Sequence, residues 1–401
     1  MSTLFIGTYA DRKLIEKINK VSSNSAQISI AAIKYSKLIS EGLDYNISNN
    51  TSLFLVPIGM YPSSSILFFN KKNVGSNNFI PFINVLFLKQ ICIAIYTLYF
   101  IFLWQINNKG KKKVIIFGFL YLPFLLSCIP FRNLKNTKIV SFVPDLPKFE
   151  FTYSTNKFSF KKYLIPTYIS LTNSIININD YFVFITKFMK DHLPQKPHLI
   201  IEGFVDSNLI NITELNCVKN KKSIMYAGAL FEKFGVKMLI DAFIEIDGDY
   251  ELWLFGYGDL DYYIVEKSKL DKRIKYFGNV NNETVFEFEK KARILLNPRP
   301  VKHEFTKYSF PSKILEYMSS GTPVLTTKLP GITEDYNDKL FFFNNDNFLD
   351  FKNTIIKYLN YSDTKLSAFG LSARNFVIKE KNNKKQISKL VKELRNLNYL
   401  N

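Results

Sequence analysis

The strongest constraint on the fold of this chain is a repeated alternation between short apolar runs and amphipathic segments, which continues through most of its 401 residues. The apolar runs, such as KVIIFGF at residues 113–119, are rich in Val, Ile and Phe at nearly every position. Such runs are typical of strands that are buried on both faces of a parallel sheet, with helices between them. The alternation therefore predicts an α/β protein and excludes a wholly disordered chain.

The alternation occurs in two series, which predict two doubly wound, Rossmann-like domains. In the first series we expect a helix at 25–39 and strands at residues 3–9, 52–58, 113–119, 138–144, 181–186 and 198–204. In the second series we expect a helix at 236–244 and strands at residues 222–228, 250–256, 273–279, 293–298 and 322–327.

A polar stretch near residues 200–220 separates the two series, so the predicted domains are residues 1–200 and 201–383. The last stretch, at 384–401, predicts an amphipathic helix through Ile387, Leu390, Val391 and Leu394. We expect this helix to pack back on the first domain. A cleft between the two domains would face the carboxyl ends of their strands.

The apolar segment at residues 80–106 is long enough to cross a bilayer of about 30 Å. We expect a long helix buried within the first domain. A helix at a membrane surface and a true membrane span are the alternatives. Lys89 and Gln90 lie within the segment, and predicted strands of one sheet flank it on both sides, so a span would pull that sheet apart.

The usage of cysteine and histidine argues against metal sites and catalytic triads. Cys92, Cys128 and Cys217 are far apart and form no CxxC pair, and the three histidines are equally scattered. We expect no metal site, and the isolated cysteines fit a reducing cytosol. The first residues, MSTLFIGTYA, lack the positive start and the apolar length of a signal sequence and predict a buried strand instead.

Positive charge is concentrated in the first half of the chain. Residues 1–200 carry 23 Lys and Arg against 8 Asp and Glu, whereas the remainder carries 30 against 26. This asymmetry predicts an anionic partner, such as membrane lipid, a lipid pyrophosphate or nucleic acid. Diffuse charge that only aids solubility is the alternative. We expect no nucleic acid to bind, because no motif combines basic and aromatic residues.

The stretch EFTKYSFPSKILEYMSSGTP, at residues 304–323, predicts a short helix between two strands. Pro311 suits the first helical position, where its missing N–H group costs nothing. Gly321 suits the left-handed position that follows the end of a helix.

The start of this short helix is a predicted anion site. The backbone N–H groups of Ser312, Lys313 and Ile314 would be unpaired there, and both the helix dipole and the Lys313 charge attract an anion. Glu316 lies one turn after Ser312, where its carboxylate can accept hydrogen bonds from paired hydroxyls such as those of a ribose. These groups together could hold a sugar nucleotide, and an ordinary capped helix is the alternative.

The order and spacing of these residues resemble the donor-binding motif of the family-4 retaining glycosyltransferases, which have the two-domain GT-B fold. The family pattern is a Glu, seven residues, a second Glu and then small-Gly-x-Pro-Val. Glu316 with SSGTPV at 319–324 matches the second half of that pattern. The stretch at 304–331 looks still closer to a bacterial branch that assembles capsule, exopolysaccharide or O-antigen. The resemblance covers most of residues 138–395.

Two departures concern the donor side. The first Glu of the family pattern falls on Tyr308, and Glu304 is a candidate substitute for it. Many family members also have an Arg and a Lys that neutralise the diphosphate. Those two positions are Ala229 and Phe234 here, and Lys233 is one position away.

A third departure concerns the acceptor side, where the family often has a functional histidine. None of the three histidines lies near the loop VPDLP at 143–147, so Asp145 is the nearest polar candidate. A turn or cap role is the alternative for Asp145.

The resemblance implies the following sets of functional residues. The catalytic candidates are Lys313, Glu304 and Asp145. The donor-binding candidates are Gly228, Gly256, Gly258, Arg299, Ser309, Phe310, Ser312, Lys313 and Glu316. The acceptor-side candidates are Gly7, Ser23, Asn24 and Ser25. Simple helix capping would explain Ser25 equally well.

Asp259-Leu260-Asp261 is a DxD tripeptide, which binds a metal in the unrelated GT-A fold. Here it follows Gly256-Tyr257-Gly258 at the end of a predicted strand, so we interpret it as the capped start of a helix. The glycines would allow the backbone to approach the donor closely.

We therefore expect a glycosyltransferase that moves a sugar from a nucleotide sugar to a glycan acceptor with retention, without a metal or a cofactor, in cell-surface polysaccharide synthesis. The expected acceptor is linked to a lipid pyrophosphate. The expected location is cytoplasmic, on an anionic membrane surface at the inner face of the plasma membrane. Two alternatives stay open: a nucleoside-diphosphate-sugar epimerase of the same fold, and a non-catalytic membrane- or anion-binding protein.

Overall fold

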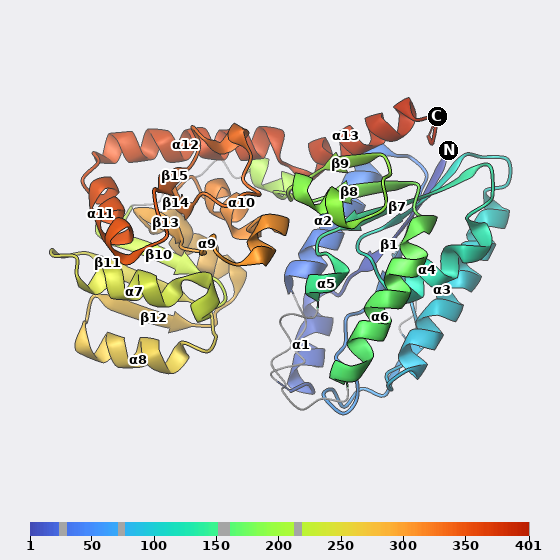
Figure 1. Cartoon of the computed structure of the whole chain (residues 1–401), viewed down its shortest axis with the longest axis horizontal. Helices are drawn as coiled ribbons and strands as arrows, with labels where there is room; N and C mark the ends of the chain where they lie inside the picture. The colour runs from blue at the N-terminus through green and yellow to red at the C-terminus, as the bar shows by residue number, and fades with distance from the viewer. Residues whose placement is uncertain (24–29, 71–76, 151–160, 212–218, 401) are drawn as a thin grey trace. The chain divides into compact units, whose positions relative to one another are not determined.

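The computed structural model describes residues 1–23, 30–70, 77–150, 161–211 and 219–400 (Figure 1). The acceptor-side candidates Asn24 and Ser25, and the start of the helix predicted at 25–39, lie outside these described residues. The chain divides into two compact units. Unit 1 consists of Met1–Ile201 and Asn383–Asn401, and unit 2 of Glu202–Asn382.

The described residues of unit 1 include a seven-stranded sheet in the order β4-β2-β1-β6-β7-β8-β9, in which all neighbouring strands are parallel. Its strands are β1 (Ser2–Thr8), β2 (Asn50–Leu55), β4 (Asn77–Phe79), β6 (Lys113–Phe117), β7 (Thr137–Val143), β8 (Tyr181–Phe184) and β9 (His198–Ile200). Every residue of β1 and β6 is buried, as their continuous apolar runs predict. Two very short strands, β3 (Phe68–Phe69) and β5 (Phe82–Ile83), pair separately in an antiparallel ribbon.

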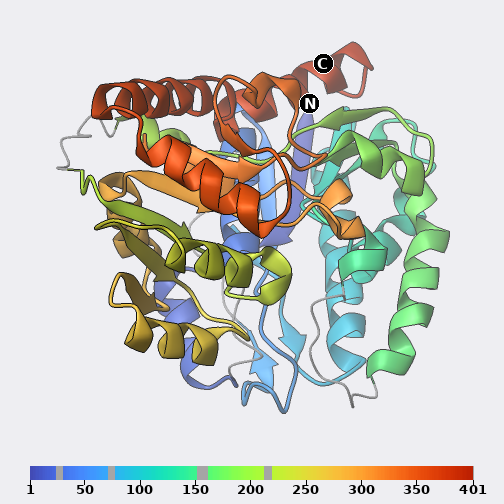
Figure 2. The same cartoon turned by 60° about the vertical axis from the view of Figure 1, so that its left-hand side comes forward.

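The helices of unit 1 include one from the far end of the chain. They are α1 (Arg12–Lys20), α2 (Ile30–Asn46), α3 (Leu88–Asn107), α4 (Leu122–Cys128), α5 (Pro147–Glu150), α6 (Lys161–Ile175) and α13 (Asn383–Asn396). The helix α13 packs against α2 through the apolar stripe that its periodicity indicates (Figures 1 and 2). Gly42 lets Ile387 approach closely, and the side-chain amide of Asn383 donates to the carbonyl of Leu38 at 3.0 Å.

The interpretation of residues 80–106 as a buried helix is wrong. The helix α3 begins only at Leu88, because the preceding residues Phe82–Ile83 form β5. One face of α3, with Ile93 and Trp104, is buried, but a second face of large apolar side chains is exposed. The helix is long and apolar enough to cross a membrane by length and composition, and 28% of its most apolar window is buried. The periodicity of α3 is too weak to reveal this two-sidedness, because both faces are apolar.

The described residues of unit 2 include a six-stranded parallel sheet in the order β12-β11-β10-β13-β14-β15. Its strands are β10 (Ser223–Ala227), β11 (Glu251–Phe255), β12 (Ile274–Gly278), β13 (Ile294–Asn297), β14 (Val324–Thr327) and β15 (Phe341–Phe343). Its helices are α7 (Val236–Ile244), α8 (Asp261–Leu270), α9 (Asn282–Lys291), α10 (Ser312–Ser319), α11 (Phe348–Leu359) and α12 (Asp363–Glu380), with the 3₁₀ turns η6 (Glu232–Phe234) and η7 (Glu304–Tyr308).

Helices pack in pairs against the sheet of unit 2. The helix α7 packs against α11, and α10 packs against α12 (Figures 1 and 2). A continuous apolar core, which includes Ile224, Phe243 and Leu296, lies between strands and helices. Both units are therefore doubly wound parallel sheets, which confirms the predicted fold class.

Candidate active site

The sheet of unit 2 changes its winding direction between β10 and β13. The chain runs from β10 outward through β11 and β12, then returns to place β13 on the other side of β10. The loops after β10 and β13 therefore leave the sheet in opposite directions at neighbouring carboxyl ends. Open α/β sheets bind their ligands at such a switch point. The predicted donor-binding residues follow β10, β11 and β13, so the fold brings them to this edge.

Glycines bring the loops at this edge into backbone contact. Gly256 has a φ of 125°, and a Cβ there would lie 2.9 Å from the carbonyl carbon of Gly228 and closer still to its oxygen. A Cβ on Gly258 would similarly meet the carbonyl of Leu230. Hydrogen bonds join the same loops, from the amide of Gly228 to Phe255 and from the amide of Leu230 to Tyr257, both at 3.0 Å. The predicted glycines thus hold one loop against the next.

Both carboxylates of the DxD tripeptide have local structural partners. Asp259 accepts a hydrogen bond from the amide of Glu232 at 3.2 Å. Asp261 accepts from the amide of Gly258 at 2.9 Å and from the hydroxyl of Tyr276 at 3.0 Å. The helix begins at Asp261 and its N-cap residue is Leu260, without a side-chain cap hydrogen bond, so the prediction that an Asp caps this helix is wrong. Among the described residues, no group of three or more His, Cys, Asp or Glu could hold a metal ion.

Two cations converge on one aromatic ring at the switch point. The guanidinium of Arg299, in the loop after β13, lies 4.7 Å from the ring centre of Phe234, and the Lys233 ammonium lies 5.4 Å from the same centre. Partial burial lowers the pKa of Lys233, the charge of Asp259 opposes this shift, and the neighbouring Arg299 charge lowers the pKa further. Two like charges held this close would be stabilised by a bound anion.

Sequence reasoning gave Lys233 no donor-site role because it lies one position from the expected cation. The turn η6, at Glu232–Phe234, and the left-handed Gly235 after it determine which side chains face the site. In this turn the ring of Phe234 is buried, and the ammonium of Lys233 lies over that ring and supplies the positive charge. A signal for this arrangement is present in the sequence as FEKFG, an aromatic and basic cluster directly before a glycine.

The helix α10 follows Arg299 in the same connection. The side chain of Arg299 donates to the hydroxyl of Ser309 at 3.4 Å, only three residues before the helix starts at Ser312. Pro311 is the N-cap residue rather than the first helical residue, which corrects the prediction by one position. Gly321 has the predicted left-handed conformation, with a φ of 78°. The predicted candidate Phe310 is buried against the ring of Tyr336.

The start of α10 offers two unpaired amides rather than three. The amide of Ile314 donates to the carbonyl of Pro311 at 2.9 Å, so its predicted availability is wrong. The amides of Ser312 and Lys313 have no partner among the described residues. The Lys313 ammonium lies 3.4 Å from the carboxylate of Glu316, with 33% and 20% of these side chains exposed. A cation and a carboxylate thus lie side by side at the mouth of the helix, as the spacing predicts.

The buried side chains of α10 fix the position of this helix relative to the switch point. Ile314, Leu315 and Met318 are buried. The buried hydroxyl of Tyr317 accepts from the amide of Ala227 at 2.7 Å and donates to the carbonyl of the same residue at 2.9 Å. Ala227 is the last residue of β10, directly before Gly228. One hydroxyl therefore fixes the helix mouth relative to the glycine loop.

The structure places Glu304 and Tyr308 in different surroundings. Tyr308, where the family resemblance expects a carboxylate, is buried with 8% exposure at the end of η7. Glu304 is exposed at the beginning of the same turn. A buried aromatic ring thus occupies the expected acidic position, and the role of Glu304 as its substitute stays a prediction.

The acceptor-side candidates within the described residues belong to unit 1. Gly7 lies inside β1 rather than at its end, and a Cβ there would lie 3.1 Å from the hydroxyl of Ser36 on α2. Ser23 is exposed, and its amide donates to the carbonyl of Ser63 at 2.8 Å. Asp145 is exposed in the loop after β7 and faces Tyr35, whose pKa is raised by burial and then by the Asp145 charge. The catalytic role of Asp145 stays a prediction.

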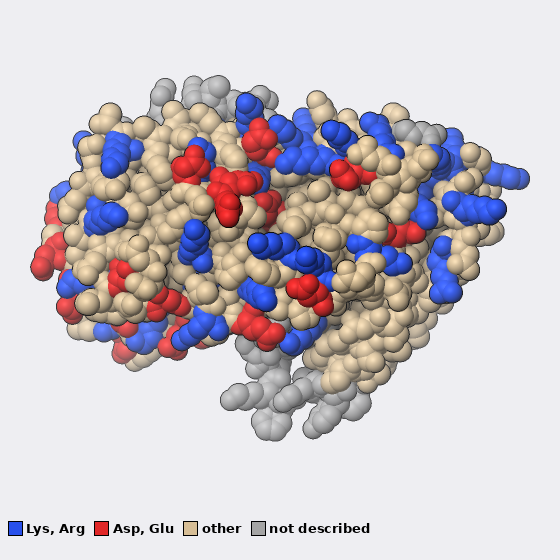
Figure 3. Space-filling model, turned by 45° about the horizontal axis from the view of Figure 1, so that its top comes forward, with Lys and Arg blue, Asp and Glu red and all other residues tan. Residues whose placement is uncertain are grey.

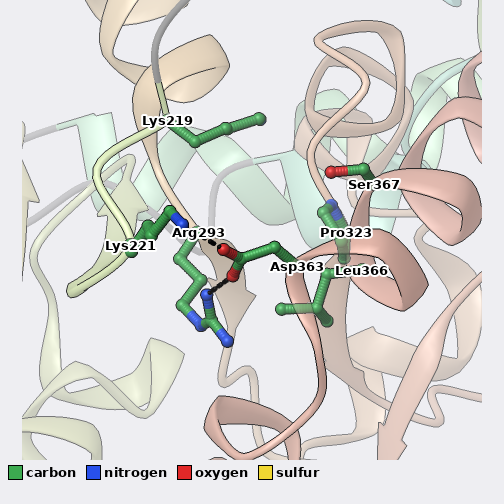
Figure 4. Close-up of a pocket in the computed structure, with 7 residues that line it drawn as sticks. All are labelled: Lys219, Lys221, Arg293, Pro323, Asp363, Leu366 and Ser367. Carbon is green, nitrogen blue, oxygen red and sulfur yellow. Dashed lines mark hydrogen bonds and ion pairs between the residues drawn. The ribbon is translucent and has the colours of Figure 1, made fainter.

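A pocket of about 160 Å³ lies elsewhere in unit 2, beside the amino ends of β10, β13 and β14 (Figure 4). Its one carboxylate, Asp363, pairs with two of its three cations, and the third, Lys219, donates to the carbonyl of Ala292. Asp363 lies 2.7 Å from Lys221 and 2.5 Å from Arg293, and Arg293 also donates to the carbonyls of Leu359 and Tyr361. We interpret this pocket as a structural ion-pair cluster, since the carboxyl ends of the strands carry the candidate site.

Residues 221–361, which contain the switch point, match the model of the family Glycosyl transferases group 1. Among solved structures, the chain is similar to sucrose-phosphate synthase from Thermosynechococcus elongatus, with a TM-score of 0.65 and 13% identity over 99% of this chain and 100% of that chain. A comparison with curated proteins finds no match.

Two further solved structures are similar over nearly the whole chain. The Anabaena protein HepE in complex with UDP-glucose gives a TM-score of 0.57 at 15% identity and covers 98% of this chain and 100% of that chain. The lipopolysaccharide outer core galactosyltransferase WaaB gives 0.58 at 15% identity, with 97% and 100% covered. These similarities show the GT-B fold. Together with the family match within unit 2, they support a glycosyltransferase of GT-B type.

Proposed function

We propose that this protein is a retaining, metal- and cofactor-independent glycosyltransferase whose nucleotide-sugar donor binds at the switch point of unit 2. The observation that carries the proposal is that Lys233, in the turn after β10, and Arg299, in the connection that leads into α10, converge on the ring of Phe234. A nucleotide sugar brings a diphosphate to any site that binds it. Two cations, two helix amides and a third cation on Lys313 form a matching anion site.

The same groups suit the chemical step. As the acceptor hydroxyl oxygen bonds to the anomeric carbon, the bond from that carbon to the diphosphate oxygen breaks and the electron pair leaves with the diphosphate. The hydroxyl proton is transferred to the departing phosphate oxygen. Charge that develops on this oxygen is stabilised by Lys313 and the amides at the start of α10. Attack from the face that the leaving group vacates gives retention and needs no protein nucleophile.

Glu316 has a different part in this proposal. Its carboxylate lies at the helix mouth and accepts hydrogen bonds from hydroxyls of the ribose or of the donor sugar. Its neighbour Lys313, 3.4 Å away, pairs with this carboxylate and orients it. Loss of Glu316 would therefore weaken the donor complex more than it would alter protein stability.

We propose that the acceptor is a glycan on a lipid pyrophosphate, at the cytoplasmic face of the plasma membrane, in cell-surface polysaccharide synthesis. The excess of 23 Lys and Arg over 8 Asp and Glu in residues 1–200 supports an anionic acceptor and an anionic membrane surface near unit 1. The resemblance to enzymes of capsule, exopolysaccharide and O-antigen synthesis supports the glycan.

The donor site is tested by three single variants, Arg299→Ala, Lys313→Ala and Glu316→Ala, with Lys302→Ala as the matched control. Lys302 is an exposed cation in the same connection after β13. A panel of nucleotide sugars that begins with UDP-glucose identifies the donor by thermal stabilisation. Each site variant should then lower turnover at least about tenfold, or about 1.4 kcal/mol, while the control stays near the parent rate. Parent rates in all three site variants would refute the assignment.

The stereochemical part has a separate test. The anomeric configuration of the first-formed product is compared with that of the donor by NMR. A product with the donor's configuration supports retention. An inverted product would leave the transferase intact but contradict the front-face mechanism.

A further inference from the structure

The helix α3 of unit 1 carries a stripe of exposed apolar side chains along its whole length. The stripe consists of Leu88, Ile91, Ile95, Tyr99, Phe102 and Ile106. These positions are three or four residues apart, so they lie on one face of the helix. Ile95 is 63% exposed and Tyr99 is 57% exposed. Six large apolar side chains in a row on one face form a surface patch that water disfavours.

The opposite face of α3 fixes the helix to unit 1. Ile93, Ile101 and Trp104 are buried. Lys89 is also buried, and its ammonium donates to the carbonyl of Ile58 and lies 4.7 Å from the ring centre of Phe82. With one face packed in this way, the helix lies along the surface of unit 1 and presents the stripe, with Leu103 beside it, to the outside.

The neighbouring helix extends the apolar surface. α3 packs against α4, and Leu126 on α4 and Ile129 just after it are 41% and 39% exposed. Figure 1 shows α3 at one side of unit 1 with α4 beside it.

The stretch of sequence that contains α3 and α4 carries charges of one sign only. Residues 45–144, a stretch of 100 residues that includes α3 and α4, contain ten Lys and Arg and no Asp or Glu. Lys109 and Lys111 are exposed directly after the end of α3, and Arg132 and Lys135 are exposed shortly after α4. In Figure 3, Lys and Arg side chains in the right-hand part, which is unit 1, border a broad surface without charged residues.

We infer that α3 is an interfacial helix whose exposed stripe enters the boundary between headgroups and acyl chains of an anionic phospholipid bilayer, while the flanking lysines and arginines bind lipid phosphates. This inference deepens the proposed function by naming the surface that holds unit 1 at a lipid-linked acceptor. It also changes the expected mode of attachment. Charge alone would give a contact that salt abolishes, whereas a buried apolar stripe keeps the protein bound when the charges are screened.

Charge decides between a bilayer and a second copy of the chain as the partner of the stripe. Two copies that met through α3 would bring their basic flanks together without any acidic residue from 45–144 to offset them. A bilayer that contains anionic lipid offers apolar depth and negative charge at the same surface.

The test compares two triple variants of the full-length chain in vesicle flotation. The first is Ile95→Gln, Tyr99→Gln and Phe102→Gln on α3. The matched control is Tyr262→Gln, Val265→Gln and Leu270→Gln on α8, where the apolar side chains are likewise exposed. The vesicles contain phosphatidylcholine with about one third phosphatidylglycerol, since anionic headgroups attract basic segments. Circular dichroism melting and nucleotide-sugar affinity confirm that each variant is folded, and they separate this test from that of the proposed function.

The α3 variant should bind vesicles at least about tenfold more weakly than the parent, and the α8 variant within about twofold of it. Parent binding should persist at high salt, and Lys109→Gln with Lys111→Gln should weaken it without abolishing it. Equal binding of the α3 variant and the parent would overturn the inference, as would complete release of the parent by salt. A different result would assign the stripe to a second copy of the chain. In that case the parent would not bind vesicles but would form concentration-dependent dimers, and the α3 variant would not form them.

A second measurement does not depend on loss of binding. Phe102→Trp places an indole in the stripe, and its emission should shift to the blue on addition of the vesicles. Brominated acyl chains should then quench it. Emission that vesicles leave unchanged would also overturn the inference.

Discussion

Replacement of Gly256 by alanine should destabilise unit 2 by considerably more than its backbone angle alone predicts. Gly256 directly follows β11 and has a φ of 125°, and a Cβ there would lie 2.9 Å from the carbonyl carbon of Gly228 and closer still to its oxygen. The obstacle is backbone, which cannot rotate away as a flexible side chain would. Gly278, at the end of the adjacent strand β12, has a φ of 66° but nothing within 4 Å of a built Cβ. It is therefore a matched control.

The difference between the two substitutions isolates the steric contribution. A positive φ in the left-handed region, where Gly278 lies, costs an L-residue with a side chain about 1–2 kcal/mol, and the φ of 125° at Gly256 costs at least as much. The clash at Gly256 adds about 1–3 kcal/mol, the usual cost of forcing extra atoms into a packed region. We therefore expect Gly256→Ala to lower the free energy of unfolding by about 2–5 kcal/mol and Gly278→Ala by about 1–2 kcal/mol.

Tryptophan fluorescence can report this unfolding from unit 2 alone. The two tryptophans of the chain are Trp104 in α3 and Trp253 in β11. In a Trp104→Phe background, Trp253 reports the urea unfolding of β11, the strand directly before Gly256. The loop at Gly228 must move to admit the methyl group, so nucleotide-sugar affinity should fall in Gly256→Ala but not in Gly278→Ala. Equal losses of stability in both variants, with equal donor affinity, would refute the close-packing argument.

Three further changes test other contacts by the same urea titration. Tyr317→Phe should lower the free energy of unfolding by about 1–3 kcal/mol, because both backbone groups of the last residue of β10 lose a buried partner. It should also raise the KM for the donor. An unchanged KM would contradict the role of Tyr317 in positioning α10. Lys381→Met should lower the free energy of unfolding by about 3–5 kcal/mol, since the carboxylate of Glu202, 2.9 Å from the ammonium, is left buried without its partner. Adding Glu202→Leu should recover most of that free energy. No recovery would contradict the pairing. Asp271→Asn should flatten the acid side of the profile of unfolding free energy against pH. Hydrogen bonds from Arg273 lower the pKa of the Asp271 carboxyl in the folded protein. The stabilisation from this pair is therefore present above the unfolded pKa near about 4 and is lost as the pH falls through the folded pKa. A constant difference between variant and parent down to low pH would exclude this linkage.

Most strands of the two sheets were predictable because they carry their own signal, whereas the short edge strands β4 and β15 were not predicted. The apolar runs around β6 and β10 are continuous, so they indicate buried parallel strands without any tertiary knowledge. The two-residue strands β3 and β5 have no such signal. Their pairing depends on the neighbours that the fold supplies, as β-pairing generally does.

The start of α10 was predictable to within one residue. Proline before a helix and glycine after it are local signals, and both Pro311 and Gly321 lie where these signals act. The paired state of the Ile314 amide was not predictable, because it depends on whether the first turn tightens to bond Pro311. The exposure of α3 was also missed, since an apolar helix gives the same sequence pattern beside protein and beside lipid.

Lys233, one position from where the family pattern has a cation, shows how a site can keep its positive charge while its sequence motif changes. A family pattern assigns charge to fixed positions, here occupied by Ala229 and Phe234. A 3₁₀ turn at Glu232–Phe234 advances about 120° per residue, so a shift by one position moves a side chain to a new face. Lys233 then reaches the ring of Phe234 from one side while Arg299, from a different connection, reaches it from the loop after β13. Because the ring attracts both cations and the cations repel each other, the arrangement is most stable when an anion lies between them. If the diphosphate is that anion, Lys233→Met should weaken nucleotide diphosphate binding more than it weakens binding of the corresponding nucleoside.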